Sequence, residues 1–307
     1  MSIDKILEIA SVHLGKAGDG SVVKPYQTPD RADPSLLVPI PRELNRTAYK
    51  ITDEIFTGYD SWNCYETSFL LNNGYPVSGV LVIEYLSNSE CIVESKSLKL
   101  YLNSYNMMRM GYSIDEAISQ FTDCVEYDLN RALNTHVSVS FVQNSQKPCV
   151  VPLYNVDFLS IDDLVDVSSL QFDTYNEDPS LIKAVESSTD TVQRLHTSAL
   201  RSNCRVTNQP DWGDVYIHIR GKRLVDPGSL LQYIVSMRQE NHFHEEICEM
   251  MYARLFEILE PAELFVACNY TRRGGIDINP VRASDTVTLS LANSCMYTGV
   301  YAKTMRQ

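Results

Sequence analysis

Two stretches of this chain repeat one pattern, and this repeat constrains the fold more than any other feature of the sequence. Residues 76–85 and 210–219 both begin Pro-x-x-Gly and continue as an apolar run, 134 positions apart. Beyond the next turn the spacing becomes 132, where Val93 and Ser97 align with Val225 and Ser229. A unit that occurs twice buries its apolar face twice in the same way. We therefore expect two copies of a small ββααβ unit, which makes the chain an α+β protein.

In the first copy, turn residues at 87–89 separate two apolar runs, a pattern that predicts a β-hairpin. A helix is expected from about Ser97. A second helix begins at the capping box that runs from Ser113 to Glu116. The strand at 136–142 completes the unit.

The second copy repeats this order, with a shorter predicted hairpin turn at 220–222. Between the copies, residues 156–192 contain nine acidic residues and one basic residue, which is typical of a solvated linker. The expected divisions are an N-terminal arm (1–46), a first module (47–145), an acidic connector (146–195) and a second module (196–307).

Net charge and cysteine spacing limit the partners and the compartment. The formal charge of −13 argues against a nucleic-acid partner and favours a small-molecule substrate. None of the eight cysteines forms a Cys-x-x-Cys pair, so we expect reduced thiols in a cytoplasm. No apolar run is long enough to cross a bilayer, and the N-terminus lacks a signal-peptide pattern.

Cys204 is the candidate nucleophile, because it lies between Arg201 and Arg205. A thiol titrates near ~8.5 and nearby positive charge lowers its pKa, so Cys204 is expected to be partly thiolate at neutral pH. Asp211 follows a proline-containing turn and is expected to return toward Cys204 as a proton donor or acceptor. Alternatively, Cys204 is a buried small apolar residue.

The segment from Glu94 to Lys99 begins a predicted helix. Free N–H groups and the helix dipole favour an anion there, and Lys96 and Lys99 add positive charge for a phosphate. Glu94 is expected to accept hydrogen bonds from a ligand. An ordinary capped helix with solvated lysines is the alternative.

His244 and Glu245 open another predicted helix. A histidine there suits proton transfer, and a carboxylate suits recognition of a base. Exposed polarity at a helix start is the alternative. His242, His244 and Cys248 lack a fourth ligand for zinc, so no metal is expected.

Arg272-Arg273-Gly274-Gly275 follows a predicted strand. Guanidinium groups and glycine N–H groups suit phosphate binding, and a plain surface turn is the alternative. No Gly-x-Gly-x-x-Gly opens a βαβ unit, so spacing alone does not indicate a nicotinamide cofactor.

Taken together, these motifs resemble the NADPH-dependent 7-cyano-7-deazaguanine reductases, the nitrile reductases of queuosine biosynthesis, in their longer two-module form. The resemblance covers most of the chain and rests on four motifs in the family's order: Glu94-Ser95-Lys96-Ser97-Leu98-Lys99-Leu100-Tyr101, Cys204 with Asp211, Phe243-His244-Glu245, and Arg272-Arg273-Gly274-Gly275.

The resemblance implies tandem tunnelling-fold modules, in which antiparallel sheets are backed by helices, and a homodimer. It implies that Cys204 adds to the nitrile of 7-cyano-7-deazaguanine to form a thioimidate. NADPH then reduces this to 7-aminomethyl-7-deazaguanine, a precursor in tRNA modification.

The resemblance also assigns roles to residues. Asp211 supplies protons, and His244 assists proton transfer and orientation. The residues implied to contact the substrate are Ile92, Val93, Glu94, His244 and Glu245. Those implied to contact NADPH are Ser95 and Lys96 in one half and Arg273 and Gly274 in the other.

The two copies differ where this chemistry is expected. At the 134 spacing, Leu70 and Val77 stand where the second copy has Cys204 and Asp211. At the 132 spacing, Asp226-Pro227-Gly228 replaces Glu94-Ser95-Lys96. We therefore expect two half-sites that combine into one active site per chain.

Two other classes of function remain open. One is another cysteine-nucleophile enzyme of the tunnelling-fold group, such as an amidase or a cyclohydrolase-like hydrolase. The other is a non-catalytic purine- or pterin-binding protein in which Cys204 is inert.

Overall fold

This computed structural model describes residues 31–143 and 158–295. Its strands and helices follow the apolar alternation and the helix-start signals of the sequence. The chain divides into two compact units. In the described residues the first unit comprises 31–45, 61–143 and 273–276, and the second comprises 46–60, 158–272 and 277–295. Parts of the expected arm (1–30), connector (146–157) and second module (296–307) lie outside the described residues.

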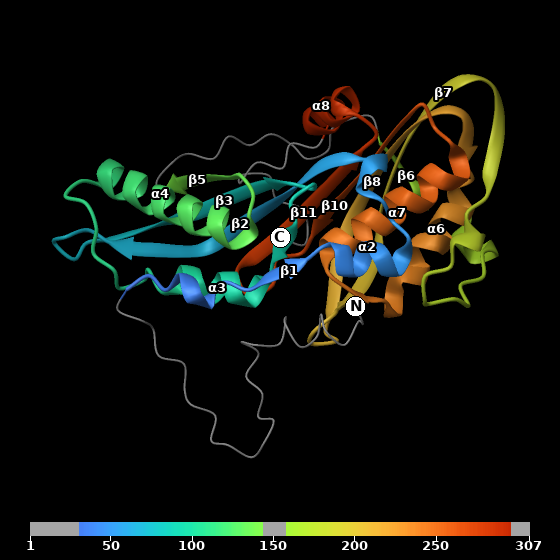
Figure 1. Ribbon diagram of the computed structural model, residues 1–307. Coiled ribbons are helices and arrows are strands. Elements are labelled where there is room, and N and C mark those ends of the chain that lie inside the picture. Colours follow the sequence, from blue (N-terminus) through green and yellow to red (C-terminus); the bar gives the residue numbers. More distant parts are fainter. Residues whose placement is uncertain (1–30, 144–157, 296–307) are drawn as a thin grey trace, which may run out of the picture. The chain divides into compact units, whose positions relative to one another are not determined.

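The first unit contains a sheet with the strand order β5-β3-β2, together with helices α3 and α4 (Figure 1). The stacked rings of Phe69 on β2 and Phe121 on α4 lie 4.7 Å apart in its core. Its elements are η1 (Pro34–Leu36), β1 (Pro39–Pro41), β2 (Thr57–Leu70), β3 (Pro76–Leu86), β4 (Cys91–Val93), α3 (Ser95–Asn103), α4 (Ile114–Leu133) and β5 (Val137–Gln143). Helix α2 (Glu43–Tyr49) begins in this unit and ends in the second, and the first residues of β2 also belong to the second unit.

The second unit has the strand order β11-β10-β8-β7-β6, with β9 beside β7. Its core is formed mainly by α6, α7 and the inward side chains of β8 and β10. Its elements are η2 (Asp53–Ile55), β6 (Leu159–Ser160), α5 (Ile161–Leu164), η3 (Val167–Ser169), η4 (Pro179–Leu181), β7 (Ala184–Cys204), β8 (Pro210–Val225), α6 (Pro227–Ser236), η5 (Met237–Gln239), β9 (Asn241–His242), α7 (His244–Leu259), β10 (Glu263–Tyr270), β11 (Ile276–Ala283) and α8 (Thr286–Cys295).

The predicted duplication is visible in both units. The first long hairpin ends one strand at Leu70 and begins the next at Pro76, and the second does so at Cys204 and Pro210. Both pairs of positions are 134 apart, as the sequence pattern predicts. The α+β class with antiparallel sheets and helices is therefore confirmed.

The duplication also covers the helix starts. Glu94 caps α3 and Asp226 caps α6, each through its side chain. One turn further on, the hydroxyls of Ser97 and Ser229 donate to the backbone oxygens of Glu94 and Asp226, at 2.7 and 2.8 Å. The same local geometry is thus built twice from an acidic cap and a serine.

Two predicted β-hairpins are wrong, although the turn predicted at 87–89 is present. Strand β4 pairs with β1, Ile92 opposite Ile40, and forms no ladder with β3 among the described residues. In the second unit β8 continues through Gly221, because β7 pairs with it from Ala184 onward. Short apolar runs indicate strands but not their partners, and both partners are far away in the sequence.

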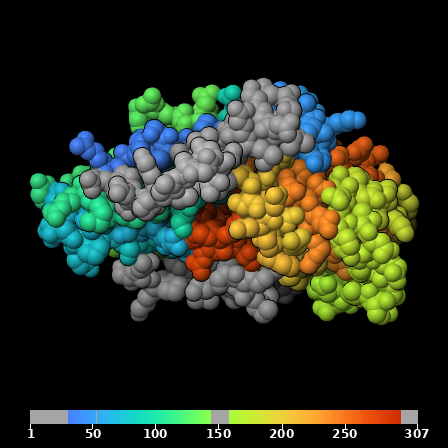
Figure 2. Space-filling model, turned by 90° about the horizontal axis from the view of Figure 1, so that it is seen from below, coloured from blue at the N-terminus to red at the C-terminus, as the bar shows by residue number. Residues whose placement is uncertain are grey.

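The acidic connector is also structured beyond residue 158, although the sequence indicates a solvated linker. Ile161 is completely buried and Ile182 is 6% exposed, both in the core of the second unit. The part of the chain that begins at Phe158, drawn in yellow-green, forms one contiguous region of the surface (Figure 2). Ile161 and Ile182 pack inward while Asp163 and Asp166 stay exposed, so charge content alone is a poor guide to order here.

The unit boundaries also lie elsewhere than the expected 47–145 and 196–307. Residues 46–60 belong to the second unit, and Arg273–Ile276 belong to the first. In the part of the chain that the structure describes, no helix is both long and apolar enough to span a membrane.

Candidate functional site

Cys204 is the last residue of β7, at the start of the turn that leads into β8. Its backbone N–H donates to the Gln209 oxygen at 2.8 Å, and its backbone oxygen accepts from Asn208 N–H at 3.0 Å. Asn208 has a left-handed φ of 54°, which asparagine tolerates better than most residues. The side chain of Cys204 is partly exposed.

Asp211 returns across this turn as predicted, and it pairs in register with Ser202 on β7. Its carboxylate oxygen Oδ2 lies 3.3 Å from Nε2 of His244, the first residue of α7. Strand register therefore brings Asp211 beside the cysteine turn, and the start of α7 brings His244 to Asp211.

Aromatic stacking fixes the plane of the His244 ring. The ring lies 3.7 Å from that of Tyr270 on β10, with an angle of only 4° between the planes. The ring nitrogen Nδ1 is buried and has no hydrogen-bond partner among the described residues. With Nε2–H donated to Asp211, Nδ1 retains a lone pair that can take a proton.

Glu245, the next residue of α7, is 2% exposed. The four predicted residues Cys204, Asp211, His244 and Glu245 all lie in the second unit. Other predicted residues lie in the first unit: Ile92, Val93, Glu94, Ser95, Lys96, Arg273 and Gly274.

At the start of α3 the Glu94 carboxylate already accepts two of the N–H groups that were expected to face an anion. Glu94 Oε1 accepts from Lys96 N–H at 2.9 Å, and Oε2 accepts from Ser97 N–H at 2.6 Å. The carboxylate itself is the anion at this helix start, so an added phosphate must rely on side-chain cations. Ile92 and Val93, both 2% exposed, precede Glu94 on β4.

A second group in the first unit joins α3 to the Arg273–Ile276 turn. Lys99 Nζ donates to the Gly274 oxygen at 2.7 Å and forms an ion pair with Glu66 at 2.9 Å. Gly274 and Gly275 have left-handed φ values of 60° and 81°, and a Cβ on Gly275 would lie 2.5 Å from the Glu66 side chain. Only glycine permits this close approach. Lys96, which lies on α3, and Arg273, which begins the turn, are both exposed.

Five other cysteines whose surroundings the structure describes suit a nucleophile less well. Burial and the Glu90 charge raise the pKa of Cys91, and burial with two aspartates raises that of Cys124. Cys64, Cys248 and Cys268 are buried. The described residues contain no group of three or more potential metal ligands, and the Cys248 thiol instead donates to the backbone oxygens of Val266 and Pro280.

Sequence reasoning missed two parts of this site. Tyr270, which stacks on His244, carries no local signal. Arg205 was expected to act on Cys204 as a free cation, but it is 5% exposed and forms an ion pair with Glu246 at 2.7 Å. The i, i+4 spacing of His242 and Glu246 indicates contact between those two residues, but it gives no signal for the Arg205–Glu246 pair.

The two-unit α+β fold, with a partly exposed cysteine across a turn from an Asp–His pair, has the residue types of an enzyme that works through a covalent cysteine intermediate. A family model described as "Nitrile reductase, 7-cyano-7-deazaguanine-reductase N-term" matches residues 28–141. A second, described as "QueF-like protein", matches residues 210–288.

Curated relatives with similar sequences include proteins named "NADPH-dependent 7-cyano-7-deazaguanine reductase" from Coxiella burnetii strains CbuK_Q154 and Dugway 5J108-111. Each is 39% identical over 271 residues, which is 86% of this chain and 91% of the relative. This chain therefore belongs to the NADPH-dependent 7-cyano-7-deazaguanine reductase family. A solved structure of an archaeosine synthase QueF-Like protein in the apo form covers 31% of this chain and 95% of its own, with 18% identity and a TM-score of 0.30.

Proposed function

We propose that this chain reduces the nitrile of 7-cyano-7-deazaguanine, with NADPH, through a thioimidate on Cys204. The chain is an NADPH-dependent nitrile oxidoreductase of queuosine biosynthesis, as its family membership indicates. The observation that carries the proposed mechanism is the Cys204 turn, with the Asp211–His244 pair on the strand and helix next to it.

The first step forms a bond from Cys204 Sγ to the nitrile carbon. One C–N π bond breaks, and the nitrogen takes a proton, which gives a thioimidate with a C=N bond. Covalent addition of this kind splits one difficult reduction into easier steps. Asp211 and His244 are proposed to share the proton that the nitrile nitrogen receives. Nδ1 of His244 is then the atom through which the imidazole can take up a new proton.

The reduction from nitrile to amine requires four electrons, and bound NADPH supplies them as two successive hydrides. A first hydride from NADPH would convert the thioimidate carbon to a tetrahedral centre, from which the Cys204 thiolate would leave. A second hydride, together with a proton taken up at nitrogen, would reduce the resulting imine to 7-aminomethyl-7-deazaguanine. The protein must therefore hold the substrate while the cofactor exchanges.

The Arg273–Ile276 turn fits NADPH. Lys96 and Arg273 supply exposed charge for phosphate oxygens, and Lys99 holds the turn through the Gly274 oxygen. The two positive-φ glycines carry no side chain, so a pyrophosphate group could approach the backbone of the turn closely. Ser95 is proposed to contact the cofactor as well.

The substrate is recognised by carboxylates. The amino-pyrimidinone edge of a deazaguanine presents N–H donors, and the carboxylates of Glu94 and Glu245 are proposed to accept hydrogen bonds from them. Each oxygen of Glu94 also accepts one backbone N–H. Ile92 and Val93 are proposed to line the base pocket.

The wider setting is proposed to be a cytoplasmic homodimer without a nucleic-acid partner. Cys64, Cys91, Cys124, Cys204, Cys248 and Cys268 are free thiols, which suits a reducing compartment. The charge of −13 suits a free base as substrate rather than tRNA.

The test is to incubate the protein with NADPH and 7-cyano-7-deazaguanine, following NADPH absorbance and product mass. We expect two NADPH to be consumed for each 7-aminomethyl product. Release of ammonia without NADPH consumption would indicate a hydrolase, and binding without any product would indicate a non-catalytic base-binding protein. Either result would overturn the proposal.

A further inference from the structure

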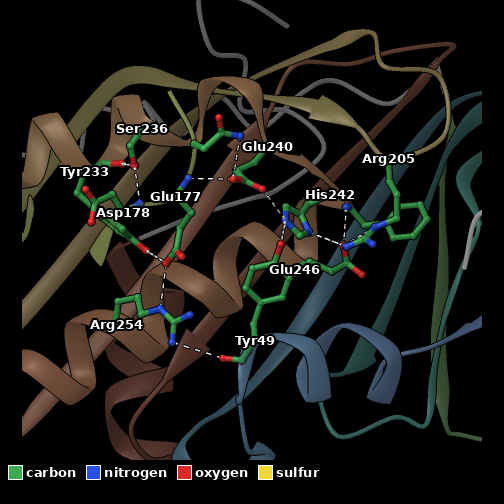
Figure 3. Close-up of polar contacts among 12 residues, drawn as sticks. Tyr49, Glu177, Asp178, Arg205, Tyr233, Ser236, Glu240, His242, Glu246 and Arg254 are labelled. Atoms are coloured by element: carbon green, nitrogen blue, oxygen red, sulfur yellow. Dashed lines mark hydrogen bonds and ion pairs between the residues drawn. The ribbon is translucent and has the colours of Figure 1, made fainter. Parts of the chain in front are cut away.

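A buried ion cluster lies next to the cysteine turn (Figure 3). Arg205, which directly follows Cys204, donates to Glu246 Oε2 from Nε at 3.1 Å and from Nη2 at 2.7 Å. His242 Nδ1 lies 3.1 Å from the same oxygen and 2.6 Å from Arg205 Nη2. The three residues are between 2% and 6% exposed.

The cluster joins the nucleophile's turn to the first turn of α7. Glu246 Oε2 also accepts the backbone N–H of Phe243 at 2.9 Å, which caps the helix that begins at His244. The Arg205 guanidinium lies 5.9 Å from the centre of the Phe243 ring. A single carboxylate oxygen therefore holds both the residue after Cys204 and the residue before His244.

Strand pairing places the same elements together. Cys204 on β7 is in register with His242 on the short strand β9, and Asn203 N–H donates to the Glu240 oxygen at 2.8 Å. From His242 the chain needs one more residue to reach His244. The geometry of the proposed nucleophile and proton donor thus depends on a few residues around Glu246.

Two carboxylates flank Arg205 and His242 in the cluster. His242 Nε2 contacts the carboxylate of Glu240 at 3.1 Å and the Tyr49 hydroxyl at 2.9 Å (Figure 3). Burial acts to lower the pKa of His242, but the carboxylates Glu240 and Glu246 outweigh it and raise that pKa. Removal of Arg205 would leave excess negative charge beside the Cys204 turn.

We propose that Arg205 is a positioning residue for the nucleophile: through Glu246 it fixes the Cys204 turn to the start of α7 and neutralises the carboxylates there. This inference rests on the proposed function for its role in nitrile reduction. The fixed geometry itself depends only on the contacts above. Arg205 touches neither substrate nor cofactor in this account.

The test compares Arg205→Met and Arg205→Lys with a matched control, Arg254→Met. Arg254 lies on α7 in the same unit, and its Nε pairs with Glu177 at 2.9 Å, so its loss also breaks a partly buried arginine–glutamate pair (Figure 3). The first readout is the rate at which iodoacetamide alkylates Cys204, measured by peptide mass across pH without substrate. The second is the rate of nitrile adduct formation, and the third is the thermal midpoint.

We expect Arg205→Met to slow both reactions of Cys204 by about 10-fold or more, because a misplaced reacting group is costly. The pH of half-maximal alkylation should move upward, since unpaired carboxylates disfavour a thiolate. Arg205→Lys keeps the charge but not the two-pronged contact, so it should recover the pH of half-maximal alkylation more fully than the rate. Arg254→Met should lower the thermal midpoint and leave both rates unchanged.

Equal effects of Arg205→Met and Arg254→Met on the two rates would overturn the inference, because the pair would then only stabilise the fold. If Arg205→Met does not fold, Arg205→Lys decides: wild-type alkylation and adduct rates in that variant would overturn it. Changed alkylation in a protein whose wild type forms no nitrile adduct would support the positioning role and contradict the proposed function instead.

Discussion

The Asp211 carboxylate and the His244 imidazole form the contact on which the proposed proton chemistry depends. One residue comes from the start of β8 and the other from the start of α7, and their side chains meet at 3.3 Å. The Tyr270 ring stacks on the His244 ring and fixes its plane, so the two ring nitrogens point in fixed directions. A change in either residue should therefore affect chemistry more than substrate binding.

Asp211→Asn is expected to lower turnover by about 10²-fold or more, because an amide cannot supply the proton that the nitrile nitrogen takes. The substrate concentration for half-maximal rate should change much less. Asp214→Asn is the control, since residues three apart on a strand face opposite sides of the sheet. Steady-state kinetics on both variants measure this, and near-normal turnover in Asp211→Asn would remove Asp211 from the mechanism.

Arg273→Ala is expected to raise KM for NADPH far more than KM for NADH. An exposed guanidinium beside the glycine turn suits the extra phosphate that distinguishes the two cofactors. The two cofactors act as each other's control in one enzyme preparation. Equal increases in both KM values would assign Arg273 to the shared pyrophosphate, or place it outside the site.

At the scale of residues, the sequence predicts the cysteine turn well and its electrostatics poorly. The proline between Cys204 and Asp211 indicates a tight return, which the Ser202–Asp211 register confirms. The state of Arg205 depends on Glu246, which is far away in the sequence. Proximity in sequence shows that a charge is near, but not whether another residue has already neutralised it.

At the scale of elements, the two modules share one device for starting a helix. An acidic cap and a serine one turn later begin both α3 and α6. A second device precedes them: the 3₁₀ helices η1 and η4 both read Pro-Ser-Leu and are capped by Asp33 and Asp178. This second repeat lies at another spacing, inside the expected arm and connector, so the spacings of 134 and 132 do not reveal it.

Glu94→Gln is expected to weaken formation of the nitrile adduct on Cys204, since a carboxylate proposed to hold the base is lost. Glutamine still accepts one of the two backbone N–H groups that Glu94 caps, so the loss of helix stability should be modest. Asp226→Asn alters the equivalent cap of α6 and is the matched control. Similar adduct rates in both variants would mean that Glu94 only caps its helix.

The buried ion cluster of Arg205, His242 and Glu246 predicts that the stability of the protein depends on pH (Figure 3). Arg205, Glu246, Glu240 and Tyr49 face His242, whose pKa is raised above its usual 6.5. Its stabilisation is therefore present below about pH 6.5 and lost as pH rises through the higher value in the folded protein. The thermal midpoint of wild type should fall over this alkaline range more than that of His242→Gln.

His218 provides the control of opposite sign, because burial lowers its pKa. Its contribution is present above about pH 6.5 and is lost as pH falls through the lower folded value. His218→Gln should therefore reduce the acid-side loss of stability and leave the alkaline side alone. An unchanged alkaline slope in His242→Gln would show that His242 is not charged in the folded protein.

At the scale of the whole molecule, the duplicated chain has one set of reactive residues. In the first unit, the hairpin equivalent to the cysteine turn has Leu70 and Val77 at the positions of Cys204 and Asp211. Leucine and valine can neither add to a nitrile nor carry a proton. The repeat is predictable from sequence because it preserves packing, whereas the boundaries of the units depend on contacts between distant segments.

The most direct test of the account is the intact mass of the protein after mixing with 7-cyano-7-deazaguanine in the absence of NADPH. The wild-type mass should increase by one ligand per chain, and peptide mapping should place the adduct on Cys204. Cys204→Ala should fold with an unchanged thermal midpoint, to within a few degrees, and gain no mass. Two adducts per chain, an adduct on Cys204→Ala, or turnover by that variant would contradict the thioimidate mechanism.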